Sequence, residues 1–130
     1  MSDPLANVTW LYRGVPLESL EVEDVQAIGE VRPPRPDRTG ERWRQFHVMG
    51  DTQTGYTSWT KDRDMAEEFA QFSGSGLSGR VVIFRVRVDS IPEERLCQGR
   101  EDEAEFLIEG AVEEVSISAS AAEEEENSND

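Results

Sequence analysis

The segment that most constrains the fold is RVVIFRVRV, residues 80–88, in which apolar and charged side chains alternate. Alternation with a period of two is typical of a β-strand, because successive side chains point to opposite faces of a sheet. The even-numbered residues of 82–88 are apolar and would face one way, whereas Arg85 and Arg87 would face the other. A strand with an apolar face needs neighbouring strands and a covered core, so the chain must supply both.

Five further segments predict short strands, because they are rich in β-branched and aromatic residues or lie between turns. They are residues 8–12, 45–49, 56–60, 103–110 and 111–119. We expect the first of them to end at Arg13-Gly14, because Val15-Pro16 follows. The sequence therefore predicts an α+β fold in which most strands are antiparallel.

Helices are expected to be few. Apolar residues at helical spacing predict one helix over residues 61–72, and a less regular pattern indicates a second over 17–30. Residues 31–44 hold three Pro, one Gly and five Arg, which is typical of a loop.

The end of the chain differs in composition from the rest. Residues 123–126 are four consecutive glutamates, Asp130 adds a fifth carboxylate, and no large apolar residue follows Ile117. Such a segment cannot bury enough apolar surface to order itself. We therefore expect one compact domain over residues 1–117 and a disordered acidic tail over 118–130.

Charge and cysteine content exclude several classes of protein. The chain has 13 basic and 28 acidic residues, a formal charge of −15. That field repels phosphate, so we expect no binding to membranes and none to nucleic acid, whereas a basic protein partner suits the acidic surface. The single cysteine, Cys97, excludes a disulfide framework and a cysteine-rich metal site, and we expect no metal. No signal sequence or long apolar run is visible, which predicts a cytoplasmic protein of bacterial or phage origin.

Three short segments contain side chains that are suited to binding or catalysis. Arg13 leaves the first strand beside a glycine. Residues 56–60, YTSWT, form a hydroxyl-rich strand that runs directly into a helix. Glu103 and Glu105 open a later strand, and their spacing of two places both carboxylates on one face.

This order and spacing resembles the Arg-Ser-Glu class of mono-ADP-ribosyltransferases over most of residues 9–117. The most specific segments are YTSWTKDRDMAEEFA and EAEFLIEGAVEEVSI. Trp59 stands where the family usually has the middle Thr of its Ser-Thr-Ser strand, and Glu109 stands where a Pro often follows. The resemblance implies a split β-sandwich, NAD as substrate, and an activity that cleaves the bond between nicotinamide and ribose.

The resemblance also implies roles for the acidic pair. Glu105 matches the catalytic glutamate, which hydrogen-bonds a ribose hydroxyl while positive charge develops on the sugar. Glu103 matches the residue that activates the acceptor, and a glutamate there resembles the members that modify arginine side chains.

The donor-binding residues follow from the same resemblance. Arg13 matches the arginine that holds NAD phosphate or ribose, and Gly14 would let the backbone approach the nicotinamide amide. Ser58 and Thr60 would hydrogen-bond Arg13 or Glu105 and orient them. Trp59 would form part of the core or of the pocket wall.

Several residues outside these three motifs can also contribute to a site. One or two arginines of the 32–44 loop can contact NAD phosphates or an acidic partner, although a solvated loop is the simpler interpretation. Trp43 or Phe46 can stack on nicotinamide. We expect His47 to be a packed or surface histidine outside the site, and Cys97 to be structural.

Two alternatives to transfer onto a protein arginine stay open. The first keeps the chemistry but uses water, a nucleic acid or a small molecule as acceptor, so that the protein acts as an NAD glycohydrolase or modifies a different target. The second is a non-catalytic acidic binding protein, either a DNA mimic or an inhibitor, which needs no NAD.

Overall fold

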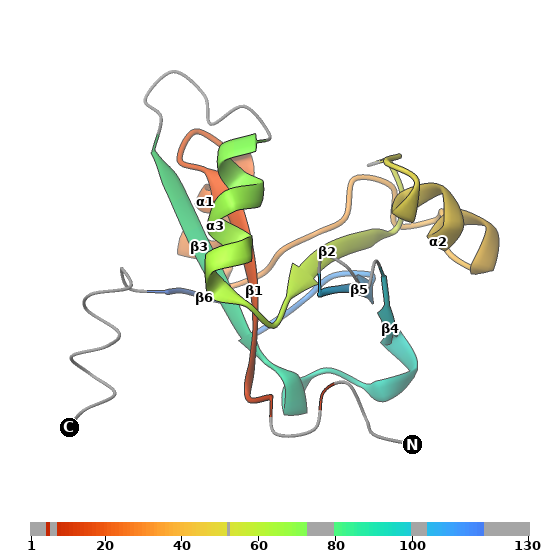
Figure 1. Cartoon of the computed structure of the whole chain (residues 1–130). Helices are drawn as coiled ribbons and strands as arrows, with labels where there is room; N and C mark the ends of the chain where they lie inside the picture. Colours follow the sequence, from red (N-terminus) through yellow and green to blue (C-terminus); the bar gives the residue numbers. More distant parts are fainter. Residues whose placement is uncertain (1–4, 6–7, 52, 73–79, 100–103, 119–130) are drawn as a thin grey trace.

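The computed structural model describes residues 5, 8–51, 53–72, 80–99 and 104–118. In these ranges three α-helices accompany one antiparallel sheet with the strand order β4–β5–β2–β1–β3–β6 (Figure 1). The strands are β1 (Trp10–Pro16), β2 (Tyr56–Thr60), β3 (Val81–Arg87), β4 (Leu96–Gln98), β5 (Glu105–Glu109) and β6 (Ser116–Ile117). The helices are α1 (Leu20–Ile28), α2 (Glu41–Val48) and α3 (Arg63–Phe72), with short 3-10 turns at Val88–Ser90 and Glu93–Arg95. The predicted α+β class with antiparallel strands is confirmed.

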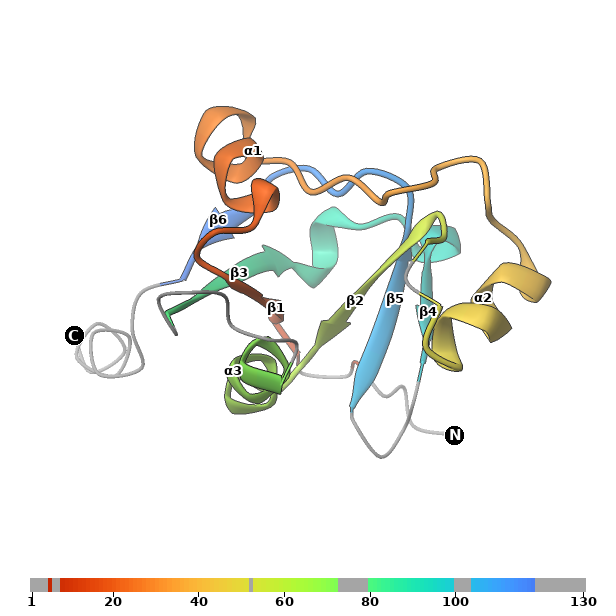
Figure 2. The same ribbon diagram turned by 90° about the horizontal axis from the view of Figure 1, so that it is seen from above.

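The sheet is almost divided between β1 and β2. Seven residue pairs join β1 to β3 and five join β2 to β5, but β1 and β2 share the single pair Tyr12–Thr60. The strands β4, β5 and β2 form one half-sheet, and β1, β3 and β6 form the other. Beyond the shared pair β2 runs away from β1, so the two half-sheets splay apart (Figures 1 and 2).

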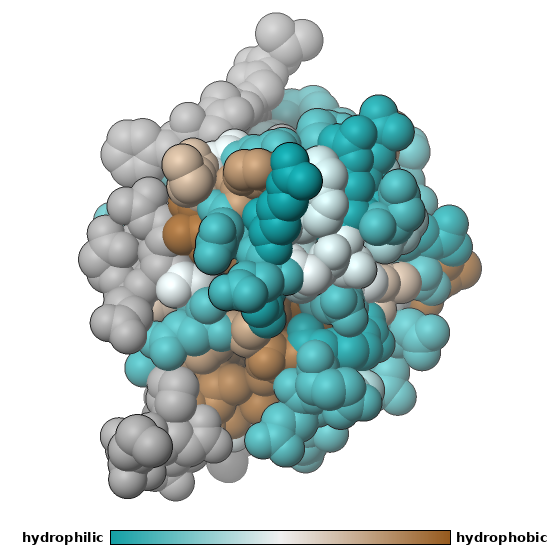
Figure 3. Space-filling model, turned by 90° about the vertical axis from the view of Figure 1, so that its right-hand side faces the viewer, coloured by the Kyte–Doolittle hydropathy of each residue, from teal (hydrophilic) through white to brown (hydrophobic). Residues whose placement is uncertain are grey.

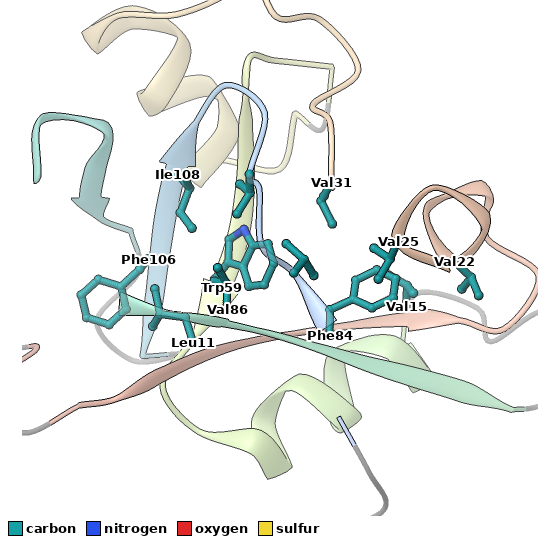
Figure 4. Packing of buried hydrophobic residues seen from close by; sticks show 12 residues of the cluster. Leu11, Val15, Val22, Val25, Val31, Trp59, Phe84, Val86, Phe106 and Ile108 are labelled. Carbon is teal, nitrogen blue, oxygen red and sulfur yellow. The ribbon is translucent and has the colours of Figure 1, made fainter. Parts of the chain in front are cut away.

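The hydrophobic core fills the angle between the two half-sheets and α1 (Figure 4). Each of the four central strands supplies a large buried side chain: Leu11 from β1, Trp59 from β2, Phe84 from β3 and Phe106 from β5. Val22 and Val25 add the inner face of α1. Because residues from both half-sheets meet in one core, apolar burial holds together a sheet that has few hydrogen bonds at its centre.

Helix α3 covers the opposite face of β1. Asp62 caps it, since its carboxylate accepts from the backbone N–H of Asp64 at 2.9 Å and of Met65 at 3.3 Å. A Cβ on Gly14 would overlap the carbonyl oxygen of Ala66 and would touch Ala70. The glycine therefore allows α3 to lie directly on β1, which is a packing role in addition to the one we expected for Gly14.

The first strand extends beyond its predicted end and includes Pro16. The N–H of Leu17 donates to Arg80 on the β3 side at 3.0 Å, so Pro16 falls at a position whose nitrogen points away from β3. Beyond the division β2 no longer runs beside β1, and the missing N–H therefore costs no hydrogen bond.

Two other assignments were wrong. Residues 41–48 form helix α2, although we expected a loop up to residue 44 and a strand over 45–49. None of the residues of α2 is buried, so the helix lacks the apolar period by which sequence patterns reveal helices. The sixth strand is instead β4, which has only three residues and lies between the segments 80–88 and 103–110, where we expected no strand.

The predicted closing strand over residues 111–119 is reduced to the two residues of β6. Ser118, which we placed in the tail, is buried, and its N–H donates to Ile83 at 2.7 Å. The rest of the predicted tail, residues 119–130, lies outside the described residues. Across the described ranges, no helix combines the length and apolar character needed to cross a membrane.

The close contact between β1 and α3 makes Gly14 sensitive to substitution. We expect Gly14→Ala to lower the free energy of unfolding by about 2–4 kcal/mol, because the clash is with backbone and α3 must move to relieve it. Gly40→Ala is the comparison, since nothing lies near a Cβ there and only its positive φ of 106° opposes the change. That strain should cost about 1 kcal/mol. Equal losses in urea unfolding would contradict the packing role.

Candidate functional site

The structure places the three motif strands side by side. Strands β1, β2 and β5 are consecutive in the sheet, and they carry Arg13, Ser58 and Glu105. Thr60 is the residue opposite both Tyr12 and Glu105, so one cross-strand row spans the junction of the half-sheets. Glu103 lies outside the described residues, and its shared face with Glu105 stays a prediction.

Arg13 crosses the division between the half-sheets. Its Nη1 donates to the carbonyl oxygen of Ser58 at 3.0 Å, on the strand that has moved away from β1. Its Nε and Nη2 donate to the two carboxylate oxygens of Glu21 on α1, at 2.8 and 3.1 Å. Three contacts to two different elements hold the guanidinium in one orientation.

The hydroxyl of Ser58 is paired with a residue that we did not assign to the site. The expected hydrogen bond between Ser58 and Arg13 is present, but Ser58 makes it with its backbone carbonyl. Its Oγ instead lies 2.7 Å from Nε2 of His47. The other ring nitrogen, Nδ1, lies 2.7 Å from the hydroxyl of Thr54, which is fully buried. His47 is therefore a packed histidine, one of the two alternatives that we expected, but it contacts a predicted site residue and so joins the candidate site.

His47 bridges α2 to β2 by these two contacts. A neutral imidazole has one N–H, so the ring donates in one contact and accepts in the other. Thr54 is held in turn, because its Oγ1 accepts from the N–H of Tyr56 at 3.2 Å. The result is a chain of oriented polar groups from the buried Thr54 to the half-buried Ser58.

The protonation of His47 is set by its surroundings. Burial lowers the pKa of His47, the Glu105 carboxylate raises it, and the Arg13 guanidinium lowers it further, with burial the largest of these effects. The net shift is downward, so the imidazole is neutral at pH 7. Both Arg13 and Glu105 are thus close enough to His47 to act on it electrostatically.

Glu105 begins β5 in a constrained position. The residue is 8% exposed, and its backbone carbonyl accepts from the N–H of Gly99 at 2.8 Å. A Cβ on Gly99 would overlap the Glu105 carboxylate, so the two residues are in close contact. Ala104 has a φ of 51°, a left-handed conformation that a residue with a Cβ adopts at a cost. The turn into β5 is therefore strained immediately before the predicted catalytic carboxylate.

Two more predicted site residues are occupied in maintaining the structure. The hydroxyl of Thr60 accepts from the N–H of Asp62 at 3.1 Å and so helps to start α3. Trp59 is 2% exposed, and its indole N–H donates to Thr57 at 2.8 Å. Trp59 thus belongs to the core.

Two cavities adjoin Arg13 and Ser58. The larger has a volume of about 530 Å³ and is lined by residues that include Arg13, Glu21, Arg32, His47, Tyr56 and Ser58. The smaller, about 320 Å³, lies where β1 and β2 separate, and its walls include Gly14, Trp59 and Ala66. Small-molecule sites commonly have volumes of about 300–1,000 Å³. Glu105 is not among the residues that line either cavity.

The arginine-rich segment divides its side chains among different surroundings. Arg32 lines the larger cavity, with its Nε donating to Glu30 at 2.8 Å. Arg38 lies 4.9 Å from the centre of the Trp43 ring, and Arg42 lies 5.5 Å from that of Phe46. Arg32 is therefore the member of this segment that is best placed to meet a ligand in the cavity.

A third cavity, of about 480 Å³, lies between α2, β4 and β5. Figure 3 shows this side of the molecule, which is largely hydrophilic with a hydrophobic area in its lower half. The thiol of Cys97 contributes to the cavity lining and donates to the carbonyl oxygen of Leu107 at 3.7 Å. Burial raises the pKa of Cys97, which keeps it a neutral thiol. Within the described ranges, no cluster of three His, Cys, Asp or Glu side chains forms a metal site.

Because His47 is the single histidine of the chain, its titration can be followed directly by NMR. We expect its pKa to lie below the ordinary value of 6.5. The unfolded chain then binds a proton that the folded protein resists, so the free energy of unfolding should fall as the pH drops from about 7 to 5.5. His47→Gln should lose this extra pH dependence. A ring that titrates at or above 6.5 would contradict the buried, neutral state.

Comparison of the chain with protein-family models, with curated proteins and with solved structures finds no match. The resemblance to the ADP-ribosyltransferases therefore stands on the Arg, Ser and Glu motifs themselves.

Proposed function

We propose that the protein is a mono-ADP-ribosyltransferase that uses NAD as donor. The observation that carries this proposal is the strand order β5–β2–β1, which brings Glu105, Ser58 and Arg13 to one junction beside two cavities. The division of the sheet into two half-sheets supports the split β-sandwich that the sequence motifs imply. The strand order thus adds a spatial argument to the motif spacing in support of this proposal.

The donor is bound in the cavities beside Arg13. The guanidinium offers paired N–H groups to the diphosphate, and Arg32 lies on the wall of the same cavity. The neutral His47 holds the Ser58 hydroxyl in place on the wall of this cavity. These groups are held before the ligand arrives, which reduces the entropy that binding must remove.

Cleavage breaks the bond between C1′ of the ribose and the nicotinamide nitrogen. The bonding electron pair leaves with the pyridinium nitrogen, which becomes neutral, and positive charge develops on the ribose. The Glu105 carboxylate stabilises this charge and holds a ribose hydroxyl, an effect that is stronger in a buried site than in water.

Transfer is completed when an acceptor nitrogen forms a bond to C1′ and releases a proton. Glu103 takes up this proton if the acceptor is an arginine, as the Glu-x-Glu pattern implies. A formal charge of −15 also attracts a cationic protein segment toward the site. Water in the same position would give free ADP-ribose, and the protein would then act as an NAD glycohydrolase.

Glu105→Gln tests this proposal because it keeps the shape of the side chain and removes its charge. We expect the release of nicotinamide from labelled NAD to fall by about 100-fold or more. Glu109→Gln is the matched control, since it makes the same change at the other end of β5. The rates are measured on purified protein with and without a cell lysate, and labelled proteins are followed in parallel.

The labelled product identifies the acceptor. Labelled protein that is lost with Glu105→Gln and retained with Glu109→Gln supports transfer to protein, and sensitivity of the label to hydroxylamine then tests for arginine. Nicotinamide release without labelled protein supports hydrolysis or a non-protein acceptor. Equal activity of the wild type and Glu105→Gln, or no release by the folded wild type, overturns the proposal.

A further inference from the structure

The guanidinium of Arg13 already carries an anionic partner. Its Nε and Nη2 donate side by side to the two oxygens of Glu21, at 2.8 and 3.1 Å. This paired edge of an arginine is the one that also binds two oxygens of a phosphate. Nη1 donates to Ser58 on β2, so the phosphate-binding edge is the part of Arg13 that Glu21 occupies.

Glu21 lies where a ligand must arrive. Arg13 and Glu21 line both the 320 Å³ and the 530 Å³ cavity. Their side chains are 22% and 25% exposed, so the ion pair is shielded but can be reached from the cavities. A phosphate that enters either cavity therefore meets the carboxylate at the same place as the guanidinium.

The backbone of Glu21 is fixed while its side chain is long enough to turn away. The N–H of Glu21 donates to the hydroxyl of Ser19, the N-cap of α1, at 3.2 Å. The carboxylate is reached through three rotatable bonds, and its contact to Arg13 is made across eight positions of the chain. Displacing it requires a change of rotamer and no movement of α1.

We infer that Glu21 is an internal counterion that occupies the phosphate-binding edge of Arg13 and is displaced by the diphosphate of the incoming ligand. This inference rests on the proposed function, in which Arg13 binds the donor phosphates. Glu21 then weakens binding, because the ligand must break an existing ion pair and leave a carboxylate near a phosphate. It also selects for ligands that carry phosphate, since a nucleoside has no group that replaces the carboxylate on Arg13.

The opposite role makes the opposite prediction. If Glu21 served only to hold Arg13 in place for the ligand, its loss would loosen the guanidinium and weaken binding. Removing the charge of Glu21 therefore strengthens ligand binding if Glu21 competes with the ligand, and weakens it if Glu21 supports Arg13. The substitution that separates them is Glu21→Gln, which keeps the side-chain length and removes the charge.

The experiment measures the binding of NAD, ADP-ribose and inorganic pyrophosphate to the full chain by calorimetry. We expect Glu21→Gln to lower the Kd of each ligand by about three- to tenfold, the range that corresponds to releasing one partly buried ion pair. Glu23→Gln is the matched control, because it removes the same charge from the same turn of α1 and Glu23 is exposed. Circular dichroism and urea unfolding establish that each variant is folded.

Steady-state kinetics supply a second measurement that a purely structural role would not produce. A displaced counterion affects the binding of the donor, so the KM for NAD should fall in Glu21→Gln while kcat stays within about twofold. If Glu21→Gln fails to fold, Glu21→Ser tests the same sign of effect with a short side chain that cannot reach Arg13.

The outcomes separate this inference from the function on which it rests. Tighter binding in Glu21→Gln but not in Glu23→Gln supports the counterion. NAD turnover with unchanged or weaker binding in Glu21→Gln overturns the counterion and leaves the proposed function standing. Tighter pyrophosphate binding without any NAD binding supports the counterion and overturns the transferase. Failure of every variant to bind any of the three ligands overturns both.

Discussion

The arrangement of this molecule depends on one residue pair, Tyr12 with Thr60, where the two half-sheets are joined. Because β1 and β2 part beyond that pair, backbone groups and side chains that a continuous sheet would cover become available to a ligand. Arg13 spans the opening by donating to the Ser58 carbonyl, and the core behind it is shared by both half-sheets. The division thus leaves room for the two cavities beside Arg13, while the two half-sheets still share one hydrophobic core.

The polar groups around the division are held mainly by one another. His47 connects the buried Thr54 to Ser58, while Glu21 and Ser58 hold Arg13 from two sides. A buried polar group without a partner is costly, so such a network is stable only when its members are paired. The contacts of His47 with Thr54 and Ser58 also keep these side chains in fixed positions, which a site for a polar ligand needs more than it needs apolar area. The inferred role of Glu21 is different, because its carboxylate leaves Arg13 when a phosphate binds.

The sequence was most informative where burial imposes a period. Strand β3 and helix α3 could be predicted, because each has apolar residues at the spacing of its element. Strand β2 is buried on both faces and shows no such period, and it was predicted from its β-branched and aromatic residues. Helix α2 buries no residue, and strand β4 is only three residues long, so neither element leaves a periodic pattern in the sequence. The motif residues could be recognised from their types and their order along the chain. The role of His47 could not, because it depends on contacts to Thr54 and Ser58, seven and eleven positions away. No periodic rule connects those positions, and only the packing of α2 against β2 brings them together.

Electrostatics act differently on the two substrates of the proposed reaction. The chain carries a charge of −15, and the cations on the cavity wall are already matched, Arg13 by Glu21 and Arg32 by Glu30. The long-range field therefore opposes an anionic donor, which must gain its affinity from short contacts after it enters, where screening by salt is weakest. The same field favours a cationic acceptor at a distance. An acidic chain whose cavity arginines are matched thus suits a transferase that binds its donor by close contact and attracts its acceptor by long-range charge.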